Sequence, residues 1–362
     1  MDALVADAGL PNSVSGLRAL GRAGIRAYAL GPSRLSPGLW SRHAAGRATG
    51  DIASAAAAHG PAAVYPGLEA TIDRLLELAP GANLVLPWDP ASLAPLREKR
   101  RLPELCAEHG LAAPATLFDG SVSELREADV PLPAVLKPGR PSGPPWTAQV
   151  VQDRAELLAR LDGLAAAEPV LVQEPARGRL TSLALVLDRD GRVAASFQEE
   201  ALRTWPRAAG SFAATVSVAP DDALAGRVAA MLSAVGYWGL AQLDLVAAPG
   251  ATIVLDVNPR FYACMPLATA CGVNLAAAWH AVVEGRDAGT PAPYPIGRRY
   301  RWLEGDLYAA RHGDLSRLRP GPRAGAGAMW SPDDPLASLM LAGAAATLPL
   351  RRRLRGGRVG LP

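Results

Sequence analysis

The stretch GYWGLAQLDLVAAPGATIVLDVNPRF, residues 236–261, decides the fold. Two apolar runs flank a Pro-Gly turn, so the stretch predicts a β-hairpin whose successive residues point to opposite faces. Gln242 and Asp244 then share a face of the first strand, and Asp256 and Asn258 share a face of the second. Four converging oxygen-bearing side chains suit magnesium, which prefers hard oxygen ligands. A solvated polar face, common on antiparallel sheets, is the alternative.

Basic residues at strand ends are the next candidates. Arg260 follows Asn258 on the same predicted face, where it could hold a phosphate or a carboxylate through two hydrogen bonds. Lys137 ends the apolar strand PAVLKP, beside the loop GRPSGPP at 139–145. Its ammonium and the N–H groups of that loop could meet phosphate oxygens. A surface lysine at a strand end is the alternative.

Two further segments supply candidate residues. The strand PVLVQE ends in Gln173 and Glu174, shortly before Ala176, as expected of a hinge that presents a polar edge to an adenine ring. A simple exit from strand to loop fits equally well. In ALRTWPRAAGS, Arg203 could neutralise charge on a transferring phosphoryl group. A solvated loop arginine is the alternative there.

Composition narrows the class of protein. With 362 residues, of which 49% are hydrophobic, the chain can form two or three subdomains. The formal net charge of +3 is small and the basic residues are scattered, so nucleic-acid binding is not predicted. The 3 cysteines lack the spacing of a zinc site or a disulfide framework, so we expect packing residues in a reducing compartment.

Targeting signals are not apparent in the sequence. The N-terminal segment MDALVADAGLPNS has no basic flank leading into a long apolar run, so we expect a cytoplasmic protein. The apolar stretch 336–350 is too short to span a membrane, although arginines follow it within 351–355. We therefore expect a helix docked on the protein, with membrane contact as the less favoured interpretation.

The order of these segments resembles the ATP-grasp superfamily over roughly residues 85–285. REKRRLPELCAEHGLAAPAT resembles the family's lysine-started helix, AVLKP its second lysine strand and VLVQEPARG its adenine hinge. The hairpin resembles the family's magnesium hairpin, in which an acidic residue precedes a Glu-x-Asn-Pro-Arg motif. The chain has only two lysines, Lys99 and Lys137, and both fall on the family's lysine positions.

The resemblance implies an ATP-grasp fold, α/β and α+β in class. Before the matched region, alternating strand and helix patterns predict a Rossmann-like α/β unit at 1–95, although LPNSVSG after the first strand lacks a dinucleotide-binding fingerprint. A lid subdomain at 96–180 and a magnesium-binding catalytic subdomain at 181–290 would clamp ATP between them. A C-terminal helical extension would occupy 291–362. We also predict one amphipathic helix that begins near Leu96 and stops at Gly110.

The resemblance further implies ATP as the nucleotide and Mg²⁺, or Mn²⁺ in its place, as the metal. Carried over by position, the implied roles are phosphate contact for Lys99 and Lys137, adenine contact for Glu174 and the Ala176 backbone beside Gln173, magnesium binding for Asp244, Asp256 and Asn258, and contact with the transferred phosphoryl group for Arg260 and Arg203.

The C-terminal stretch RRYRWLEGDLYAARHG resembles predicted carboxylate-amine ligases, the group that contains D-aspartate ligase. That group implies an acyl-phosphate intermediate, release of ADP and phosphate, and an amide or peptide product. The substrates would be a small carboxylate, amino acid or peptide-like, and an amine, and homodimers are frequent among such enzymes. The alternatives are a carboxylase that uses bicarbonate and a non-catalytic ATP-binding regulatory protein. Asp256, where the family usually has glutamate, and the proline-rich loop at 139–145 favour the last.

Overall fold

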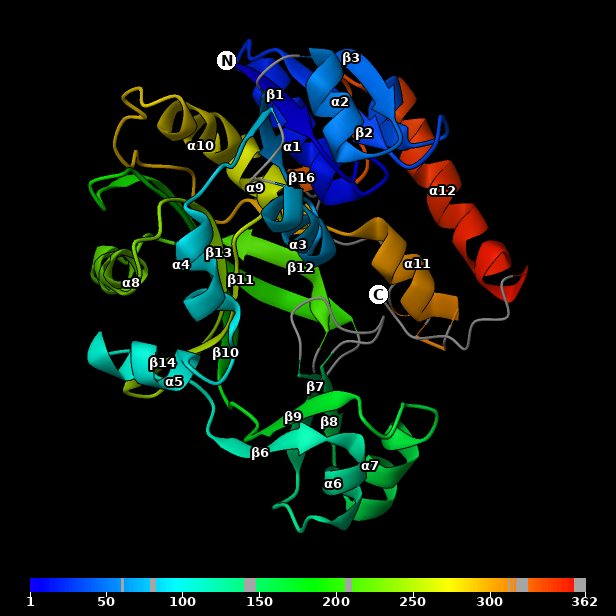
Figure 1. The fold of residues 1–362 in the computed structure, drawn as a ribbon, viewed down its shortest axis with the longest axis vertical. Coiled ribbons are helices and arrows are strands. Elements are labelled where there is room, and N and C mark those ends of the chain that lie inside the picture. Colours follow the sequence, from blue (N-terminus) through cyan, green and yellow to red (C-terminus); the bar gives the residue numbers. More distant parts are fainter. Residues whose placement is uncertain are drawn as a thin grey trace.

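Three β-sheets organise the chain. The computed structural model describes residues 1–59, 62–78, 83–139, 148–205, 210–311, 313–314, 316 and 325–354. Within these residues a five-stranded sheet lies at the end of the molecule that holds the N-terminus. A seven-stranded sheet lies in the middle, and a four-stranded sheet lies at the opposite end of the molecule (Figure 1).

The N-terminal unit contains a parallel sheet of order β3-β2-β1-β4-β5. Its central strands are apolar and almost entirely buried, as expected of a parallel sheet that helices cover. The strands are β1 (Asp2–Val5), β2 (Ala27–Gly31), β3 (Ala44–Thr49), β4 (Ala62–Tyr65) and β5 (Leu84–Val85), and the helices are α1 (Pro11–Arg22), α2 (Ile52–His59) and α3 (Glu69–Leu78), with a short 3-10 turn η1 (Pro37–Trp40).

The connection to the next sheet corrects one prediction. In place of a single helix from Leu96, the chain forms α4 (Pro90–Arg97) and α5 (Leu102–Glu108). Glu98 leaves the helical backbone with ψ of 94°. Pro103 is tolerated in the first turn of α5, whereas inside a longer helix its ring would clash with the preceding turn. Lys99 consequently lies in the turn between two helices and not on a helix.

The four-stranded sheet, of order β6-β9-β7-β8, is antiparallel and has its own hydrophobic core. Two short helices cover it, and α6 begins with a capping box in which Ser121 and Glu124 exchange hydrogen bonds. We call this unit the lid. Its elements are β6 (Thr116–Ser121), α6 (Val122–Glu127), β7 (Ala134–Pro138), β8 (Gln149–Val151), α7 (Arg154–Leu161) and β9 (Pro169–Gln173).

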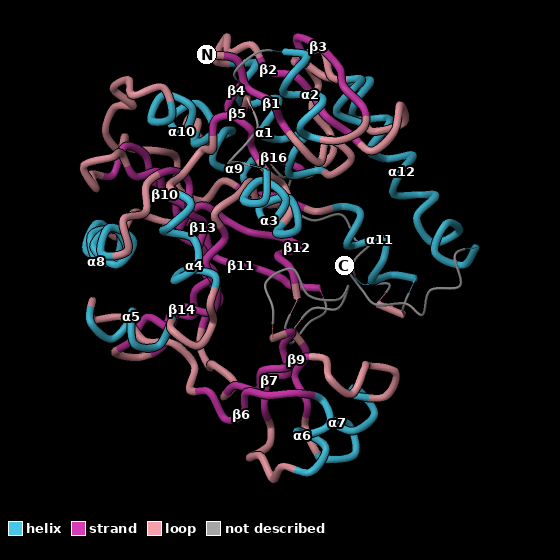
Figure 2. The backbone as a smooth tube through the Cα atoms, viewed as in Figure 1, coloured by secondary structure: helices cyan, strands magenta, loops and turns pink. Residues whose placement is uncertain are grey.

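The seven-stranded sheet has the order β14-β13-β10-β11-β12-β15-β16. An Asp-Gly turn joins β10 to β11, and Gly191 adopts the positive φ of 78° that such a turn requires. Helices α8 and α10 lie along one side of the sheet (Figure 2). The elements are β10 (Arg179–Leu187), β11 (Val193–Trp205), β12 (Ser211–Ser217), α8 (Asp222–Ala234), β13 (Gly239–Ala248), β14 (Ala251–Asn258), α9 (Met265–Ala270) and α10 (Leu275–Val283).

The C-terminal segment joins the large sheet before it becomes helical again. Strands β15 (Arg299–Arg301) and β16 (Ala326–Gly327) extend the sheet edge, with α11 (Leu303–Arg311) between them in sequence. Helix α12 (Pro335–Leu354) contacts η1 of the N-terminal unit. Among the described residues, no helix is both long and apolar enough to cross a membrane. The loop positions 140–147 and the side chains of the arginines at 351–355 lie outside the described residues.

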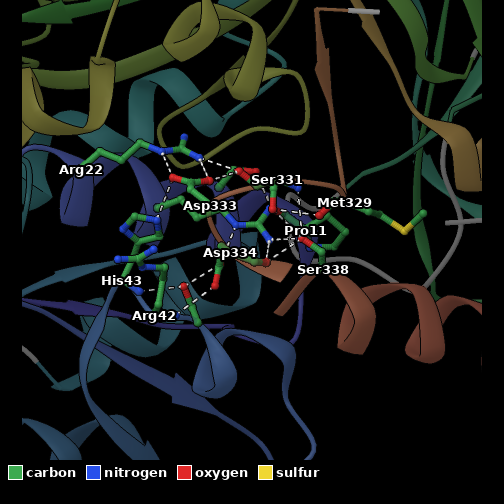
Figure 3. Close-up of polar contacts among 12 residues, drawn as sticks. Pro11, Arg22, Arg42, His43, Met329, Ser331, Asp333, Asp334 and Ser338 are labelled. Atoms are coloured by element: carbon green, nitrogen blue, oxygen red, sulfur yellow. Dashed lines mark hydrogen bonds and ion pairs between the residues drawn. The ribbon is translucent and has the colours of Figure 1, made fainter. Parts of the chain in front are cut away.

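Ion pairs between α1 and the residues that precede α12 hold the C-terminal segment in place (Figure 3). Arg18 Nε donates to Asp334 Oδ2 at 2.8 Å, and its Nη2 donates to Ser338 at 2.9 Å. Arg22 Nη2 lies 2.7 Å from Asp333 Oδ1. The Arg18–Asp334 pair is buried, whereas the Arg22–Asp333 pair is exposed. We call these two pairs the C-terminal clasp.

Candidate functional site

The β13–β14 hairpin sets the predicted metal-binding residues on one face of the large sheet. Asp244 lies directly opposite Asp256, and Gln242 lies opposite Asn258, so the four side chains share a face as the alternation predicted. The pairing then shifts by one residue, which leaves Leu255 as the extra residue of a β-bulge. The carbonyl oxygen of Leu255 accepts a hydrogen bond from Lys137 of the lid.

The hairpin forms part of a cleft of about 700 Å³, within the usual range for small-molecule sites. The N-terminal unit, the lid and the large sheet all contribute to its walls. Most of the site residues predicted from the sequence line it: Lys99, Lys137, Glu174, Ala176, Asp244, Asp256, Asn258 and Arg260. Glu69 and Arg260, which are 191 positions apart in sequence, thus meet in one place.

Hydrogen bonds fix the amide groups of the hairpin. Gln242 Nε2 donates to Ser182 Oγ at 2.8 Å and to Asp244 Oδ1 at 2.9 Å. Asn258 Nδ2 donates to Gln242 Oε1 at 2.8 Å. Because Gln242 and Asn258 are buried, this network satisfies groups that would be costly to leave unpaired. It holds the Asp244 carboxylate in one orientation toward the cleft.

Arg260 is held by groups on both sides. Its Nη2 donates to Asn258 Oδ1 at 2.8 Å, and its Nε donates to Glu69 Oε1 at 2.9 Å. The second oxygen of Glu69 accepts from Arg97 Nε, also at 2.9 Å. Arg97 and Glu69 both line the cleft, and sequence reasoning missed them. Neither belongs to a local pattern, because the contacts form only when the N-terminal unit meets the hairpin.

Lys137 places a buried ammonium at the cleft. Its side chain is 8% exposed, and Nζ lies 3.4 Å from the Leu255 carbonyl oxygen. Burial and the charge of Lys99 lower the pKa of Lys137 to about 8, while the carboxylates of Asp256 and Asp244 act in the opposite direction. An anion bound beside Lys137 would favour its charged form.

The predicted hinge lies at the edge of the lid. Glu174 and Ala176 line the cleft, and the Glu174 backbone N–H donates to the Ala115 carbonyl at 2.9 Å. Gln173 is buried in β9 and does not line the cleft. Its Oε1 has no hydrogen-bond partner among the described residues.

Arg203 is the one charged candidate that the structure keeps apart from the others. Its Nη2 donates to Asp306 Oδ2 at 2.9 Å, and Arg301 contacts the same buried carboxylate. Strand β11 is irregular on both sides of Arg203, and the next residue, Thr204, lines the cleft instead. The predicted role of Arg203 at a phosphoryl group therefore requires it to leave an ion pair.

The two hairpin carboxylates suit a bound cation. Burial and the neighbouring Asp256 raise the pKa of Asp244 to about 6, although the Gln242 hydrogen bond acts against the rise. Among the described residues, neither Asp244 nor Asp256 belongs to an ion pair. No group of three His, Cys, Asp or Glu side chains in the described part of the chain could hold a metal. A metal here would be magnesium-like, with water and phosphate oxygens completing its shell.

A polar row continues behind the hairpin. Asp256, Asp244, Ser182 and Glu199 lie opposite one another across four adjacent strands. Glu199 is buried, accepts a hydrogen bond from Thr215 at 2.6 Å, and burial raises its pKa to about 8. Sequence reasoning missed Glu199, because it lies between Gln198 and Glu200 and looks like part of a solvated polar stretch.

Comparisons with known proteins find similarity in structure only. No family model matches the chain, and no curated protein matches it in sequence. Rhizobium etli pyruvate carboxylase superposes with a TM-score of 0.65 at 14% identity, over 83% of this chain and 30% of that one. The chain thus matches under a third of that protein's length.

Two further solved structures match this chain over a larger share of their own length. The biotin carboxylase domain of Hydrogenobacter thermophilus 2-oxoglutarate carboxylase, solved with MgADP, ADP and bicarbonate, has a TM-score of 0.62 at 14% identity, covering 83% of this chain and 73% of that one. N5-carboxyaminoimidazole ribonucleotide synthetase from Thermus thermophilus gives 0.59 at 19% identity, covering 83% and 81%. With the three-sheet architecture, these similarities confirm the predicted ATP-grasp fold.

Proposed function

We propose that this chain is an ATP-dependent ligase that joins a small-molecule carboxylate to an amine through an acyl phosphate. The observation that carries the proposal is the convergence in one cleft of Asp244 and Asp256 with Lys137 and Arg260. Paired carboxylates beside cations suit a magnesium nucleotide whose terminal phosphate is transferred. The similar 2-oxoglutarate carboxylase domain, which was solved with MgADP, supports this interpretation.

The residues of the cleft divide between nucleotide binding and phosphoryl transfer. Glu174 and the Ala176 backbone would bind the adenine, and Lys99 and Lys137 the phosphates. Asp244 and Asp256, with Asn258, would hold Mg²⁺, or Mn²⁺, which accepts the same oxygen ligands. When bound, the metal would neutralise charge on the phosphates.

Arg260 would stabilise the group that is transferred. The acid's carboxylate oxygen bonds to the γ-phosphorus as the bond to ADP breaks, which gives an acyl phosphate and ADP. The amine nitrogen then bonds to the acyl carbon, phosphate leaves, and the nitrogen loses a proton. The protein needs no side-chain nucleophile for this sequence. Cys264 lines the cleft but is buried, and burial keeps the pKa of its thiol well above the usual range, so it remains protonated at neutral pH.

ADP release tests the proposal directly. We expect the protein, given ATP and Mg²⁺, to release ADP only with a matching acid and amine from a panel of amino acids, short peptides and amines. One amide should form for each ADP. The Lys137→Met variant should lose this turnover, whereas Asp222→Asn, on the exposed first turn of α8, should retain it. Failure to release ADP with any pairing, despite nucleotide binding, would favour a regulatory protein.

A carboxylase is the second candidate, favoured by the carboxylase domain solved with bicarbonate and by the carboxyaminoimidazole ribonucleotide synthetase. The two reactions differ in the acid that ATP activates. ADP release that requires bicarbonate, with labelled carbonate appearing in an acid-labile product, would identify a carboxylase. ADP release that is unaffected by removal of bicarbonate would identify the carboxylate-amine ligase.

The Lys137 ammonium predicts a pH dependence for nucleotide binding. Its free-state pKa of about 8 means that it is charged below that pH and loses its proton above it. Bound phosphate favours the charged form, so binding above pH 8 requires proton uptake and becomes weaker. We expect the Kd for MgADP to rise roughly three- to tenfold between pH 7 and pH 9, measured by calorimetry. A Lys137→Met variant that keeps the same pH dependence would assign it to another group.

A further inference from the structure

Glu69 links the N-terminal unit to the phosphate end of the cleft. It is the first residue of α3, and its carboxylate lines the cleft. Oε1 accepts from Arg260 Nε and Oε2 accepts from Arg97 Nε, each at 2.9 Å. The side chains of Arg97, Glu69 and Arg260 are 9%, 20% and 23% exposed, so water screens these pairs only partly.

The contacts of Arg260 define what remains available on its guanidinium. Five N–H groups are present, and three donate to described residues: Nε to Glu69, Nη2 to Asn258 and Nη1 to the Phe261 carbonyl oxygen at 3.2 Å. Among the contacts of the described residues, one N–H on each terminal nitrogen therefore has no acceptor. Both of these N–H groups can donate to the oxygens of a phosphate or carboxylate.

We propose that Glu69 is a positioning residue that holds Arg260 so that these two N–H groups bind the terminal phosphate of the nucleotide. The inference rests on the proposed function and extends it, because it gives the N-terminal unit a direct part in phosphoryl-group recognition. Glu69 also separates two positive charges, on Arg97 and Arg260, that would otherwise repel each other. If the charge of Glu69 is removed, Arg260 keeps its hydrogen bonds to Asn258 and to the Phe261 carbonyl oxygen. It loses its only ionic partner among the described residues.

A purely structural role for Glu69 makes a different prediction. As an acidic residue in the first turn of α3, Glu69 also stabilises that helix through its dipole. Loss of that effect would destabilise the N-terminal unit, and the affinities for ATP and ADP would then fall to a similar degree. Action through Arg260 would instead affect only a nucleotide that carries the terminal phosphate. The difference between ATP and ADP recognition therefore separates the two roles.

Affinities for two nucleotides test the proposal without turnover. Isothermal calorimetry would measure the Kd of adenylyl imidodiphosphate, a non-hydrolysable ATP analogue, and of ADP, both with Mg²⁺. We expect Glu69→Gln to weaken binding of the analogue about tenfold, as for loss of a charge-assisted contact, and that of ADP less than twofold. In an Arg260→Met background, Glu69→Gln should cause no additional loss, because the group through which it acts is gone.

Asp73 offers a matched control. Asp73 Oδ1 lies 2.7 Å from Arg97 Nη2, so Asp73→Asn removes an acidic partner of Arg97 while Glu69 still holds Arg260. We expect its affinities for both nucleotides to stay within twofold of the unmodified protein. Equal weakening of both nucleotides by Glu69→Gln, or an undiminished effect in the Arg260→Met background, would overturn the positioning role. An unmodified protein that binds neither nucleotide would instead overturn the proposed function, and this inference with it.

Discussion

Asp256→Asn is expected to lower ATP-dependent ADP formation by about a thousandfold while the protein remains folded. Asp256 lies opposite Asp244 on the hairpin, is half-buried, and belongs to no ion pair among the described residues. The substitution keeps size and polarity but removes the charge that would attract Mg²⁺. Loss of metal-assisted charge neutralisation costs several kcal/mol of transition-state stabilisation, and each ~1.4 kcal/mol is a factor of ten in rate.

Single-turnover ADP formation across a series of Mg²⁺ concentrations would measure this effect. The Asp256→Asn variant should need much more Mg²⁺ for half-maximal rate, and circular dichroism should match that of the unmodified protein. Asp256→Glu is the informative partner variant, because the ATP-grasp family usually has glutamate at the position that Asp256 matches. It should retain activity if the bulged strand accommodates one extra methylene. Unchanged turnover and unchanged Mg²⁺ dependence in Asp256→Asn would rule out a metal-binding role for this carboxylate.

Sequence reasoning succeeded where local periodicity fixes the geometry. The alternation of Gln242 and Asp244 with Asp256 and Asn258 was enough to place four side chains on one face, because strand pairing across a short turn leaves little freedom. The position of Lys137 beside the cleft follows from a similar local pattern, since this residue lies near the end of an apolar strand. The expected ATP-grasp fold followed from the order of such local segments and is confirmed by the structure.

What sequence reasoning missed depends on contacts between distant parts of the chain. Glu69 and Arg97 looked like ordinary charges near helix ends, and only the docking of the N-terminal unit on the hairpin brings Glu69 to Arg260. Arg203 is the opposite case, a residue that the sequence pointed to and that tertiary contacts hold away from the cleft. Its type and position suited a phosphoryl group, but the irregular β11 and the buried Asp306 hold it elsewhere. Helix ends and ion pairs of this kind are set by tertiary packing, which residue patterns do not encode.

Breaking the buried Arg18–Asp334 pair of the C-terminal clasp is expected to cause a large loss of stability. Arg18→Met should lower the free energy of unfolding by about 3–5 kcal/mol, because it leaves the Asp334 carboxylate buried without its cation. Burial alone would raise the pKa of Asp334, but hydrogen bonds from Arg18 and Ser41 outweigh it and the pKa is lowered. A lowered carboxyl pKa stabilises the fold above the unfolded-state value, and this stabilisation is lost as the pH falls.

Urea denaturation of the full chain at pH 7 and pH 4 would measure both effects. At pH 7 the Arg18→Met midpoint should fall well below that of Arg22→Met, because the Arg22–Asp333 pair is exposed and such pairs contribute about 0–1 kcal/mol. At pH 4 the gap between Arg18→Met and the unmodified protein should narrow, since protonation of Asp334 removes the unpaired charge. Equal midpoints for the two arginine variants at pH 7 would show that the Arg18–Asp334 pair contributes no more to stability than a surface pair. The apolar contacts of Val14 with Ala337 and Leu341 would then be what holds α12 in place.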